Sequence, residues 1–237
     1  MEFNNNKNIL KKLHKDIFIN RGVRLTRDSI PNFPESQIIA ECYEMDKEDQ
    51  DKINAAYDEM RLELLKIEKL LKKDKKSSEL TAILRARQKV EMTKVPLFVD
   101  MVEDALENNM SIAVFLNFSE TIEALSQRLN TKCIVNGEAK YAKTRQQSID
   151  DFQADKQRVI LINLAAGGAG LNLHDITGKH PRLALISPSY SAVNMRQATG
   201  RVWRDSAKSK SIQKIVFVAN TVEEKVCDSV KIGRAHV

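Results

Sequence analysis

Apolar residues follow two different patterns along the chain, and the change falls near residue 110. Before it, apolar residues recur at alternating steps of four and three over residues 53–71, the spacing of an amphipathic helix that begins after an N-cap at Asp46. This helix is predicted to end in the lysine-rich run KKDKKSS. Two further helices are predicted, one over residues 79–90 and one from Pro96 through Leu106.

After residue 110, short continuous apolar runs alternate with helical segments, which is the pattern of buried parallel strands. Five strands are predicted, over residues 112–116, 133–135, 159–162, 183–186 and 215–218. Helices are predicted over residues 119–129, 144–152, 192–199 and from 222 onward. This alternation predicts an α/β fold, a parallel sheet with helices on both faces. One earlier apolar run, residues 38–43, has the length of a further short strand.

These patterns divide the chain into a mainly helical region over residues 1–95 and an α/β domain over residues 96–230. Pro31 and Pro34 interrupt the first region, whose opening part has no clear period. The last seven residues, 231–237, read KIGRAHV, like the translation of a common sequencing-adapter oligonucleotide. We expect this tail to be non-native and the natural chain to continue beyond it.

The composition sets limits without defining a function. The chain has 237 residues, a formal net charge of +6 and a pI of about 9.1, which fits a polyanionic partner without requiring one. Its three cysteines form no CxxC pair and its four histidines supply no zinc spacing, so we predict no metal site and a reducing compartment. No apolar run approaches the length of a membrane span, and the N-terminus lacks the apolar core of a signal peptide. We therefore expect a soluble intracellular protein with no membrane partner.

The first candidate for chemistry is the segment QATGRVWR, residues 197–204. Arg201 and Arg204 are three residues apart, a spacing that on a helix places both guanidinium groups on one face. Gly200 would leave room there for a ligand or a second backbone. Paired planar donors that stay charged suit phosphate oxygens. A solvated basic helix end is an equally good interpretation of this segment alone.

A second set of candidates follows the predicted strands. Asn117, residues 167–175 and residues 187–190 each come after a strand, so we expect them to share one rim of the sheet. The run GGAG in the middle segment can turn sharply and offer N–H groups to an anion, although an ordinary strand-to-helix turn is the commoner explanation of such a loop. His174 beside Asp175 is more typical of structural hydrogen bonding than of a catalytic pair. Trp203 is more typical of a core residue than of a base-stacking platform.

Four stretches in a fixed order carry more information than any one of them: FLNFSETIEAL, VNGEAKYAKTRQQSIDDFQ, VILINLAAGGAGLNLHD and ISPSYSAVNMRQATGRVWR. In this order they resemble motifs IV, IVa, V, and Va running into VI of the second motor lobe of superfamily-2 helicases and translocases, nearest the Swi/Snf-type and the viral or phage helicase-like ATPases. The resemblance covers about residues 111–228, and residues 21–36 more faintly resemble the connector after the first lobe. It implies a RecA-like fold that forms part of an ATP-dependent nucleic-acid motor.

The resemblance also implies a role for each matching position on the nucleotide side. Arg201 and Arg204 match arginine fingers, which neutralise charge that grows on the γ-phosphate of ATP. Gly170, Asn172 and Gln197 match positions that approach the nucleotide.

On the nucleic-acid side, the resemblance implies contacts from Asn117, from the backbone amides of Gly167 and Gly168, and from Arg145. Contacts of this kind go to the nucleic-acid backbone and do not read sequence. DNA is the expected partner more than RNA, although backbone contacts alone do not distinguish the two.

Departures from the family pattern bear on the subfamily. Asn163 and Leu164 stand where the family often has Ser-Thr at the end of the motif V strand. Residues 186–190, ISPSY, stand where Swi/Snf-type proteins usually carry an acid and a tryptophan, and Asp205-Ser206 stands where they often have Gly-Gln. These differences favour a divergent viral or phage branch over a chromatin remodeller.

The sequence contains no Walker-type phosphate loop, GxxxxGK[ST], and no DExx pair after a strand. The run Gly178-Lys179-His180 lacks the upstream glycine and has histidine in place of the Mg²⁺-binding hydroxyl residue. The resemblance therefore implies that a first motor lobe outside this chain holds ATP and Mg²⁺, that this lobe is a partner, and that residues 1–95 connect to it. The isolated chain is predicted to be inactive. The alternative is a non-catalytic basic module that binds nucleic acid or protein.

Overall fold

The computed structural model describes residues 7–19, 30, 33–67, 72–166, 170–221, 223–224 and 226–227. The chain separates into two compact units, residues 1–33 and 34–237. The N-terminal unit contains α1 (Lys7–Leu13) and a π-helix, η1 (His14–Ile19). Five large apolar side chains of these two helices are exposed: Ile9, Leu10, Leu13, Ile17 and Ile19. The predicted tail, residues 231–237, lies outside the described residues.

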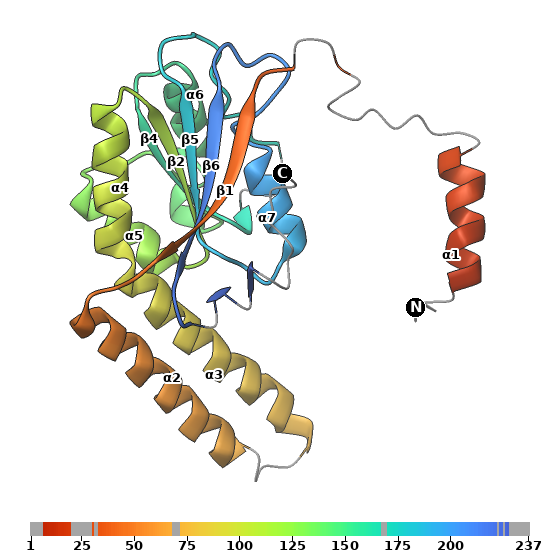
Figure 1. Ribbon diagram of the computed structural model, residues 1–237, viewed down its shortest axis with the longest axis vertical. Helices are drawn as coiled ribbons and strands as arrows, with labels where there is room; N and C mark the ends of the chain where they lie inside the picture. Colours follow the sequence, from red (N-terminus) through yellow and green to blue (C-terminus); the bar gives the residue numbers. More distant parts are fainter. Residues whose placement is uncertain are drawn as a thin grey trace. The chain divides into compact units, whose positions relative to one another are not determined.

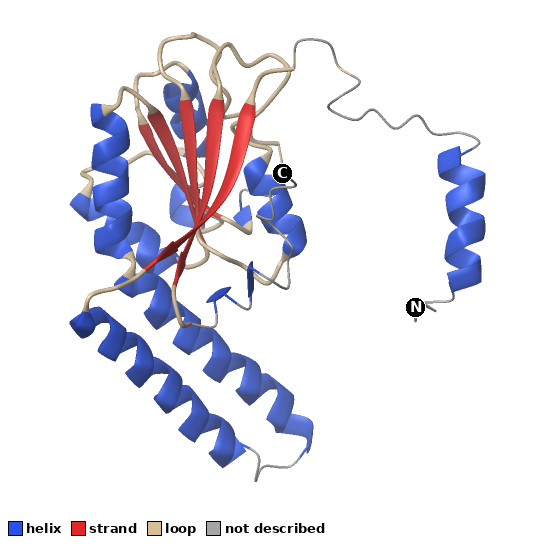
Figure 2. Ribbon diagram, in the orientation of Figure 1, coloured by secondary structure: helices blue, strands red, loops and turns tan. Residues whose placement is uncertain are grey.

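A parallel sheet organises the second unit (Figures 1 and 2). Its strands are β1 (Ser36–Tyr43), β2 (Ser111–Leu116), β3 (Ile134–Val135), β4 (Val159–Asn163), β5 (Arg182–Ile186) and β6 (Ser211–Val218). They lie in the order β1-β6-β5-β2-β4-β3 with parallel pairing throughout. The predicted α/β fold is confirmed, and all five strands predicted after residue 110 are present.

The sheet also contains β1, which precedes the predicted domain of residues 96–230. β1 pairs with β6 along its whole length, from Ser36 opposite Ser211 to Tyr43 opposite Val218. Side chains reinforce this pairing, since Ser36 Oγ donates to Gln213 Oε1 at 2.8 Å. The first part of the chain is therefore more than a helical connector, because it supplies an edge strand of the same sheet.

Two long helices follow β1. They are α2 (Lys47–Ile67) and α3 (Lys72–Thr93), which pack against each other as a hairpin. Asp46 caps α2 as predicted, because its Oδ1 accepts a hydrogen bond from the N–H of Asp49 at 2.8 Å. The lysine-rich run KKDKKSS begins α3, whereas we predict it at the end of α2. The prediction is wrong because the run has no apolar period to place it, and lysine has a high helix propensity in either helix.

Helices cover both faces of the sheet, as predicted. Helices α4 (Val95–Glu107) and α5 (Ser119–Arg128) pack on one face, and α6 (Arg145–Gln153) and α7 (Ala192–Thr199) pack on the other. A short 3-10 helix, η3 (Ala139–Tyr141), precedes α6. Along β2, Ala113 and Phe115 belong to the core under α6 and α7, whereas Ile112, Val114 and Leu116 belong to the core under α4 and α5.

The α2–α3 hairpin lies at the carboxyl edge of the sheet, below the strands in Figure 1. Helix α3 leads into α4, and its last turns carry the side chains that reach the loops after β2 and β5. No described helix is both long and apolar enough to cross a membrane. Within the described ranges, no group of three or more His, Cys, Asp or Glu side chains could hold a metal ion.

Candidate nucleotide and nucleic-acid site

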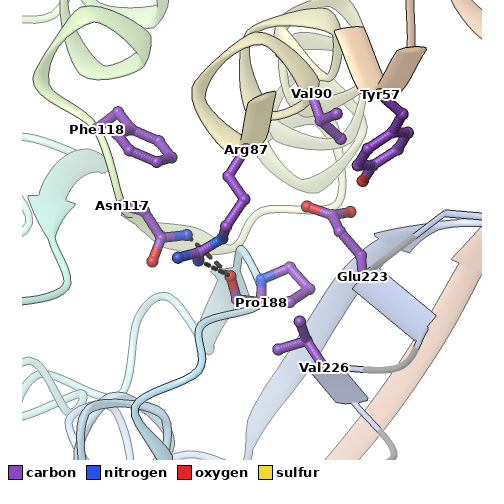
Figure 3. Close-up of a pocket in the computed structure, with 8 residues that line it drawn as sticks. All are labelled: Tyr57, Arg87, Val90, Asn117, Phe118, Pro188, Glu223 and Val226. Atoms are coloured by element: carbon purple, nitrogen blue, oxygen red, sulfur yellow. Dashed lines mark hydrogen bonds between the residues drawn. The ribbon is translucent and has the colours of Figure 1, made fainter. Parts of the chain in front are cut away.

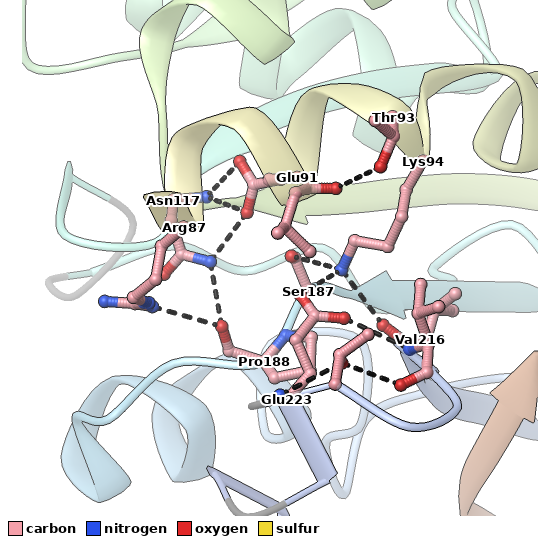
Figure 4. A network of polar contacts seen from close by, with 12 residues as sticks. Arg87, Glu91, Thr93, Lys94, Asn117, Ser187, Pro188, Val216 and Glu223 are labelled. Carbon is pink, nitrogen blue, oxygen red and sulfur yellow. Dashed lines mark hydrogen bonds and ion pairs between the residues drawn. The ribbon is translucent and has the colours of Figure 1, made fainter. Parts of the chain in front are cut away.

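Asn117 lies at the centre of the carboxyl edge, immediately after β2 (Figure 4). Its Nδ2 donates to Glu91 Oε2 at 2.7 Å and to the carbonyl oxygen of Pro188, after β5, at 2.9 Å. Its own carbonyl oxygen accepts from Asn163 Nδ2, at the end of β4, at 3.1 Å. The expected meeting of these three strand ends is therefore confirmed.

Glu91 of α3 organises this edge, and the sequence motifs do not identify it. Glu91 is 1% exposed. Its carboxylate accepts from the N–H groups of Asn117 and Phe118 at 3.0 to 3.1 Å, in addition to the Asn117 amide. A buried carboxylate needs such donors to offset its lost hydration. Both amide protons of Asn117 are thereby engaged by Glu91 and Pro188, so Asn117 has no side-chain proton left to donate to a phosphate while these bonds hold.

A small pocket lies beside Asn117, between α3 and the loop after β5 (Figure 3). Arg87 lines it, with its guanidinium carbon 4.9 Å from the ring centre of Tyr190 and 5.9 Å from that of Phe118. Nη2 of Arg87 also donates to the carbonyl oxygen of Pro188 at 3.4 Å. Tyr190 is 52% exposed. An arginine held against an exposed aromatic ring offers both charge and a stacking face to a nucleic acid.

Lys94, between α3 and α4, is completely buried at the same edge (Figure 4). Its Nζ donates to Glu223 Oε1 at 2.7 Å, to Ser187 Oγ at 3.0 Å and to the carbonyl oxygen of Val216 at 3.3 Å. These bonds join the α3–α4 junction to the ends of β5 and β6. Because the ammonium charge is paired internally, Lys94 supports the fold and is not available to a ligand.

The glycine-rich stretch, residues 167–175, begins just after a turn that Asn163 shapes. Asn163 Oδ1 accepts from the N–H groups of Ala165 and Ala166 at 3.0 and 3.2 Å. Arg145, the first residue of α6, donates from Nη2 to the carbonyl oxygen of Ala166 at 3.1 Å. Asparagine in place of the family's usual serine therefore has a local reason, because one side chain holds both the turn and the neighbouring strand end.

Of the three glycines in this stretch, the structure describes Gly170. Gly167 and Gly168 lie outside the described residues. Gly170 has φ of +71°, a left-handed conformation that favours glycine. Asn172 is exposed and Gln197 of α7 is half-buried.

The arginine segment, residues 201–208, lies after α7. The helix ends at Thr199, as predicted, with Gly200 as its C-cap, so Arg201 and Arg204 lie beyond it and do not share a helical face. Gly200 has φ of −84°, and an added Cβ would meet nothing closer than 3.6 Å. No atom of the described protein therefore excludes a side chain here, and the expected room for a ligand or a second backbone stays a prediction. The low helix propensity of glycine instead favours the end of the helix at this point.

The two guanidinium groups nevertheless influence each other. Arg201 is 8% exposed, and its Nη1 donates to the carbonyl oxygen of Leu171 at 3.4 Å. Burial and the positive charge of Arg204 lower the pKa of Arg201. Arg204 is more exposed, and in the part of the chain that the structure describes it forms no salt bridge with a carboxylate. Two neighbouring cations of which one is open to solvent have the charge expected of an anion site.

Trp203 anchors the arginine segment to the chain before β1. Its Nε1 donates to the carbonyl oxygen of Pro34 at 2.7 Å, and the residue is half-buried. This arrangement supports its interpretation as a packing residue and not a base-stacking platform.

The downstream end of the glycine-rich stretch leaves the carboxyl edge. Asp175 Oδ1 accepts from the N–H groups of Thr177 and Gly178, each at 2.9 Å, in the turn before β5. Thr177 Oγ1 also donates to Asp155, which pairs with Arg182, the first residue of β5, at 2.6 Å. The predicted common rim is therefore wrong for Asp175, because the chain must pass from the end of β4 to the start of β5.

Comparisons with known proteins agree with this geometry. Residues 93–206 match the family described as helicase conserved C-terminal domain. The chain is 37% identical over 199 residues to a protein named as an ATP-dependent RNA helicase of Acanthamoeba polyphaga mimivirus, covering 84% of this chain and 36% of that protein. It is 31% identical over 128 residues to the DNA repair and recombination protein RAD54 of Oryza sativa subsp. japonica, covering 51% of this chain and 12% of that protein.

A solved structure of the C-terminal part of the Fun30 ATPase domain has a similar fold, with a TM-score of 0.64 and 14% identity over 86% of this chain and 92% of that chain. Residues 93–206 thus carry a helicase conserved C-terminal domain, and together with the motifs these matches support a C-terminal lobe of the superfamily-2 helicase type. The chain spans about a third of the length of the mimivirus relative and a smaller share of the rice protein.

Proposed function

We propose that this chain is the C-terminal motor lobe of an ATP-dependent nucleic-acid helicase or translocase, and that Arg201 and Arg204 are its arginine fingers. The observation that carries the proposal is the arginine pair itself. Arg201 is fixed by a bond to the glycine-rich stretch, and its pKa is lowered by burial and by the charge of Arg204. A bound phosphate would relieve this repulsion between like charges.

In this proposal the lobe contributes transition-state stabilisation and the first lobe contributes nucleotide binding. The fingers donate to oxygens of the γ-phosphate as negative charge develops, an effect typically worth about 10³- to 10⁵-fold in rate. Gly170, Asn172 and Gln197 would line the nucleotide on this side. Mg²⁺, which neutralises phosphate charge in such enzymes when it is bound with ATP, would be held by residues of the first lobe.

For the nucleic-acid track, we propose backbone contacts from the amides of Gly167 and Gly168, from Arg145, and from the stacked pair of Arg87 and Tyr190. The pair is added because its geometry combines a cation with an exposed ring at the same edge. Asn117 would then contribute mainly by holding that edge, since its amide protons are engaged.

We propose DNA as the polymer on which the motor acts.

We also propose that the protein acts inside the cell, in the host cytoplasm or nucleus if it is viral. Cys42, Cys133 and Cys227 form no disulfide, which supports a reducing compartment. Burial raises the pKa of the Cys133 thiol to about 12, which keeps that thiol unreactive.

The test is ATP hydrolysis by the full-length polypeptide that contains this lobe, measured with DNA, with RNA and with neither. We expect stimulation by DNA, no activity from residues 1–237 alone, and a rise in the DNA concentration needed for half-maximal stimulation in Arg87→Ala and Arg145→Ala. Loss of one phosphate contact lowers the slope of log affinity against log salt by about one.

Three outcomes would contradict parts of this proposal. Hydrolysis by residues 1–237 alone would refute the division of the site between two lobes. Stimulation by RNA only would contradict the choice of DNA as the polymer and favour RNA. Salt-dependent nucleic-acid binding by the full-length polypeptide without any hydrolysis would favour the alternative, a non-catalytic basic binding module.

A further inference from the structure

The glycine-rich stretch and the arginine segment run beside each other and are joined at several points. The N–H of Leu173 donates to the carbonyl oxygen of Arg201 at 2.9 Å, and the N–H of Lys208 donates to the carbonyl oxygen of Asp175 at 2.9 Å. The bond from Arg201 Nη1 to Leu171 adds a side-chain link. These bonds fix the first and last parts of the arginine segment, and Arg204 lies between them.

His174 supplies a side-chain link in the interval that contains Arg204. Its residue is 7% exposed, and its Nε2 lies 3.0 Å from Ser206 Oγ. The serine hydroxyl donates to Nε2 in the neutral tautomer protonated at Nδ1, and it accepts from Nε2–H in the other tautomer. Nδ1 is buried and has no hydrogen-bond partner among the described residues. Ser206 is exposed, so its hydroxyl is not needed to fill the core.

The charges around His174 also favour the neutral ring. Burial lowers the pKa of His174, and the nearby cations Arg204 and Arg182 lower it further. Asp205 and Asp175 act in the opposite direction with smaller effect. Gln153 of α6 reaches only the carbonyl oxygen of His174. Protonation would place another cation beside Arg204, and it would put a proton on both ring nitrogens although the buried Nδ1 has no acceptor among the described residues.

We propose that His174 is a positioning residue for Arg204, and that it acts through Ser206 to hold the arginine segment against the glycine-rich stretch. Residues 171–175 of the glycine-rich stretch and the finger then move as one rigid piece when nucleic acid binds. This inference rests on the proposed function, because it assigns His174 an effect only where Arg204 serves as a finger. Serine at position 206 in place of the family's usual glutamine supplies the hydroxyl that the link requires.

The test uses the full-length polypeptide, DNA-stimulated hydrolysis, and the variants Ser206→Ala, His174→Leu and His174→Gln. Displacing a catalytic group by about 1 Å can cost about 100-fold in rate. We expect Ser206→Ala and His174→Leu each to lower kcat by about 10-fold with little change in KM for ATP. His174→Gln should recover most of the activity, since its amide oxygen can accept the serine proton.

Two readouts separate positioning from simple packing. The double variant Ser206→Ala/His174→Leu should be no slower than His174→Leu, because both changes break the same link. In the wild type, kcat should fall as the pH decreases below the usual range of histidine, and this acid limb should be absent in His174→Gln. His180→Gln, a change at a half-buried histidine on the neighbouring turn whose Nδ1 contacts the carbonyl oxygen of Asn109, is the matched control and should behave as wild type.

Several results would overturn the inference. Full activity of Ser206→Ala, additive losses in the double variant, or an unchanged acid limb in His174→Gln would each contradict it. If Arg204→Ala is itself fully active, the proposed function fails. If Arg204→Ala is inactive while the His174 and Ser206 variants are normal, only the present inference fails. Thermal melts of each variant, with Ser206→Ala at an exposed position, distinguish loss of positioning from loss of fold.

Discussion

The carboxyl edge of the sheet and the arginine segment both gather polar side chains, but they use them in opposite ways. At the edge, charges are satisfied within the protein: Glu91 accepts from Asn117 and Phe118, and Lys94 pairs with Glu223. In the arginine segment, burial and the neighbouring positive charge of Arg204 lower the pKa of Arg201.

This difference separates groups that build the lobe from groups that await a ligand. A buried polar group whose bonds are all made adds structure and specificity of fold. Neighbouring like charges raise the free energy of the unliganded protein until an anion binds. The contrast therefore predicts stability effects at the edge and catalytic effects in the arginine segment.

Removing the ammonium of Lys94 should have the largest effect on stability. Lys94→Met leaves Glu223 buried without its partner, and breaking a buried pair from one side costs about 3–5 kcal/mol. The free energy of unfolding of residues 1–237, from denaturant titration, measures this. Lys132→Met, at an exposed lysine, should change that free energy by less than about 0.5 kcal/mol. Equal stability of the two variants would remove the contrast between the regions.

Glu91→Gln should have the next largest effect. An amide NH₂ would replace one acceptor oxygen that faces the N–H donors of Asn117 and Phe118, at a cost of about 1–3 kcal/mol. Denaturant titration again measures the loss, with Glu107→Gln at an exposed position of α4 as the control. A variant as stable as the control would show that the carboxylate is not needed to hold this edge.

These two positions also show what could be predicted from sequence. Buried strands such as β2 and β5 are predictable because every residue in them is buried and the apolar run is continuous. The order of motifs adds the class of protein and the candidate arginines. Glu91 and Lys94 are not predictable, because their partners lie 26 and 129 residues away and no local period marks them.

Two other differences between the sequence predictions and the structure have local causes. Strand β1 is half-buried at an edge of the sheet, so its apolar signal is weak and its pairing with β6 is set by distant residues. The arginine pair lies beyond the end of α7, which is predicted correctly at Thr199, and outside a helix a spacing of three residues does not fix how two side chains lie relative to each other.

The His174 link predicts a smaller, pH-dependent effect on stability. Its pKa is lowered in the folded lobe from the ordinary value of 6.5, so the unfolded chain binds this proton more readily. The stabilisation that neutral His174 contributes is therefore complete above the unfolded-state pKa of 6.5, and it is lost as the pH falls through the lower folded-state pKa. Unfolding free energies at about pH 5.5 and about pH 7.5 should differ less in His174→Gln than in the wild type. An identical difference in both proteins would contradict this assignment.

Changes at two glycines should have the smallest effects and opposite signs. Gly200→Ala fits its backbone conformation and should be neutral or stabilise by up to about 1 kcal/mol. Gly170→Ala must adopt a positive φ and should destabilise by about 1 kcal/mol. Thermal melts of both variants check this pair, and a larger loss for Gly200→Ala would show that close approach does require glycine there.

The central claim is that Arg204 acts on the phosphate and not on the fold. Single-turnover ATP hydrolysis by the full-length polypeptide, together with ATP affinity, tests it most directly. Arg204→Ala should slow the chemical step by about 10³-fold or more with little change in ATP affinity, whereas Arg196→Ala, an exposed arginine of α7, should hydrolyse ATP at the wild-type rate. Equal rates for Arg204→Ala and Arg196→Ala, with both proteins folded, would contradict the claim.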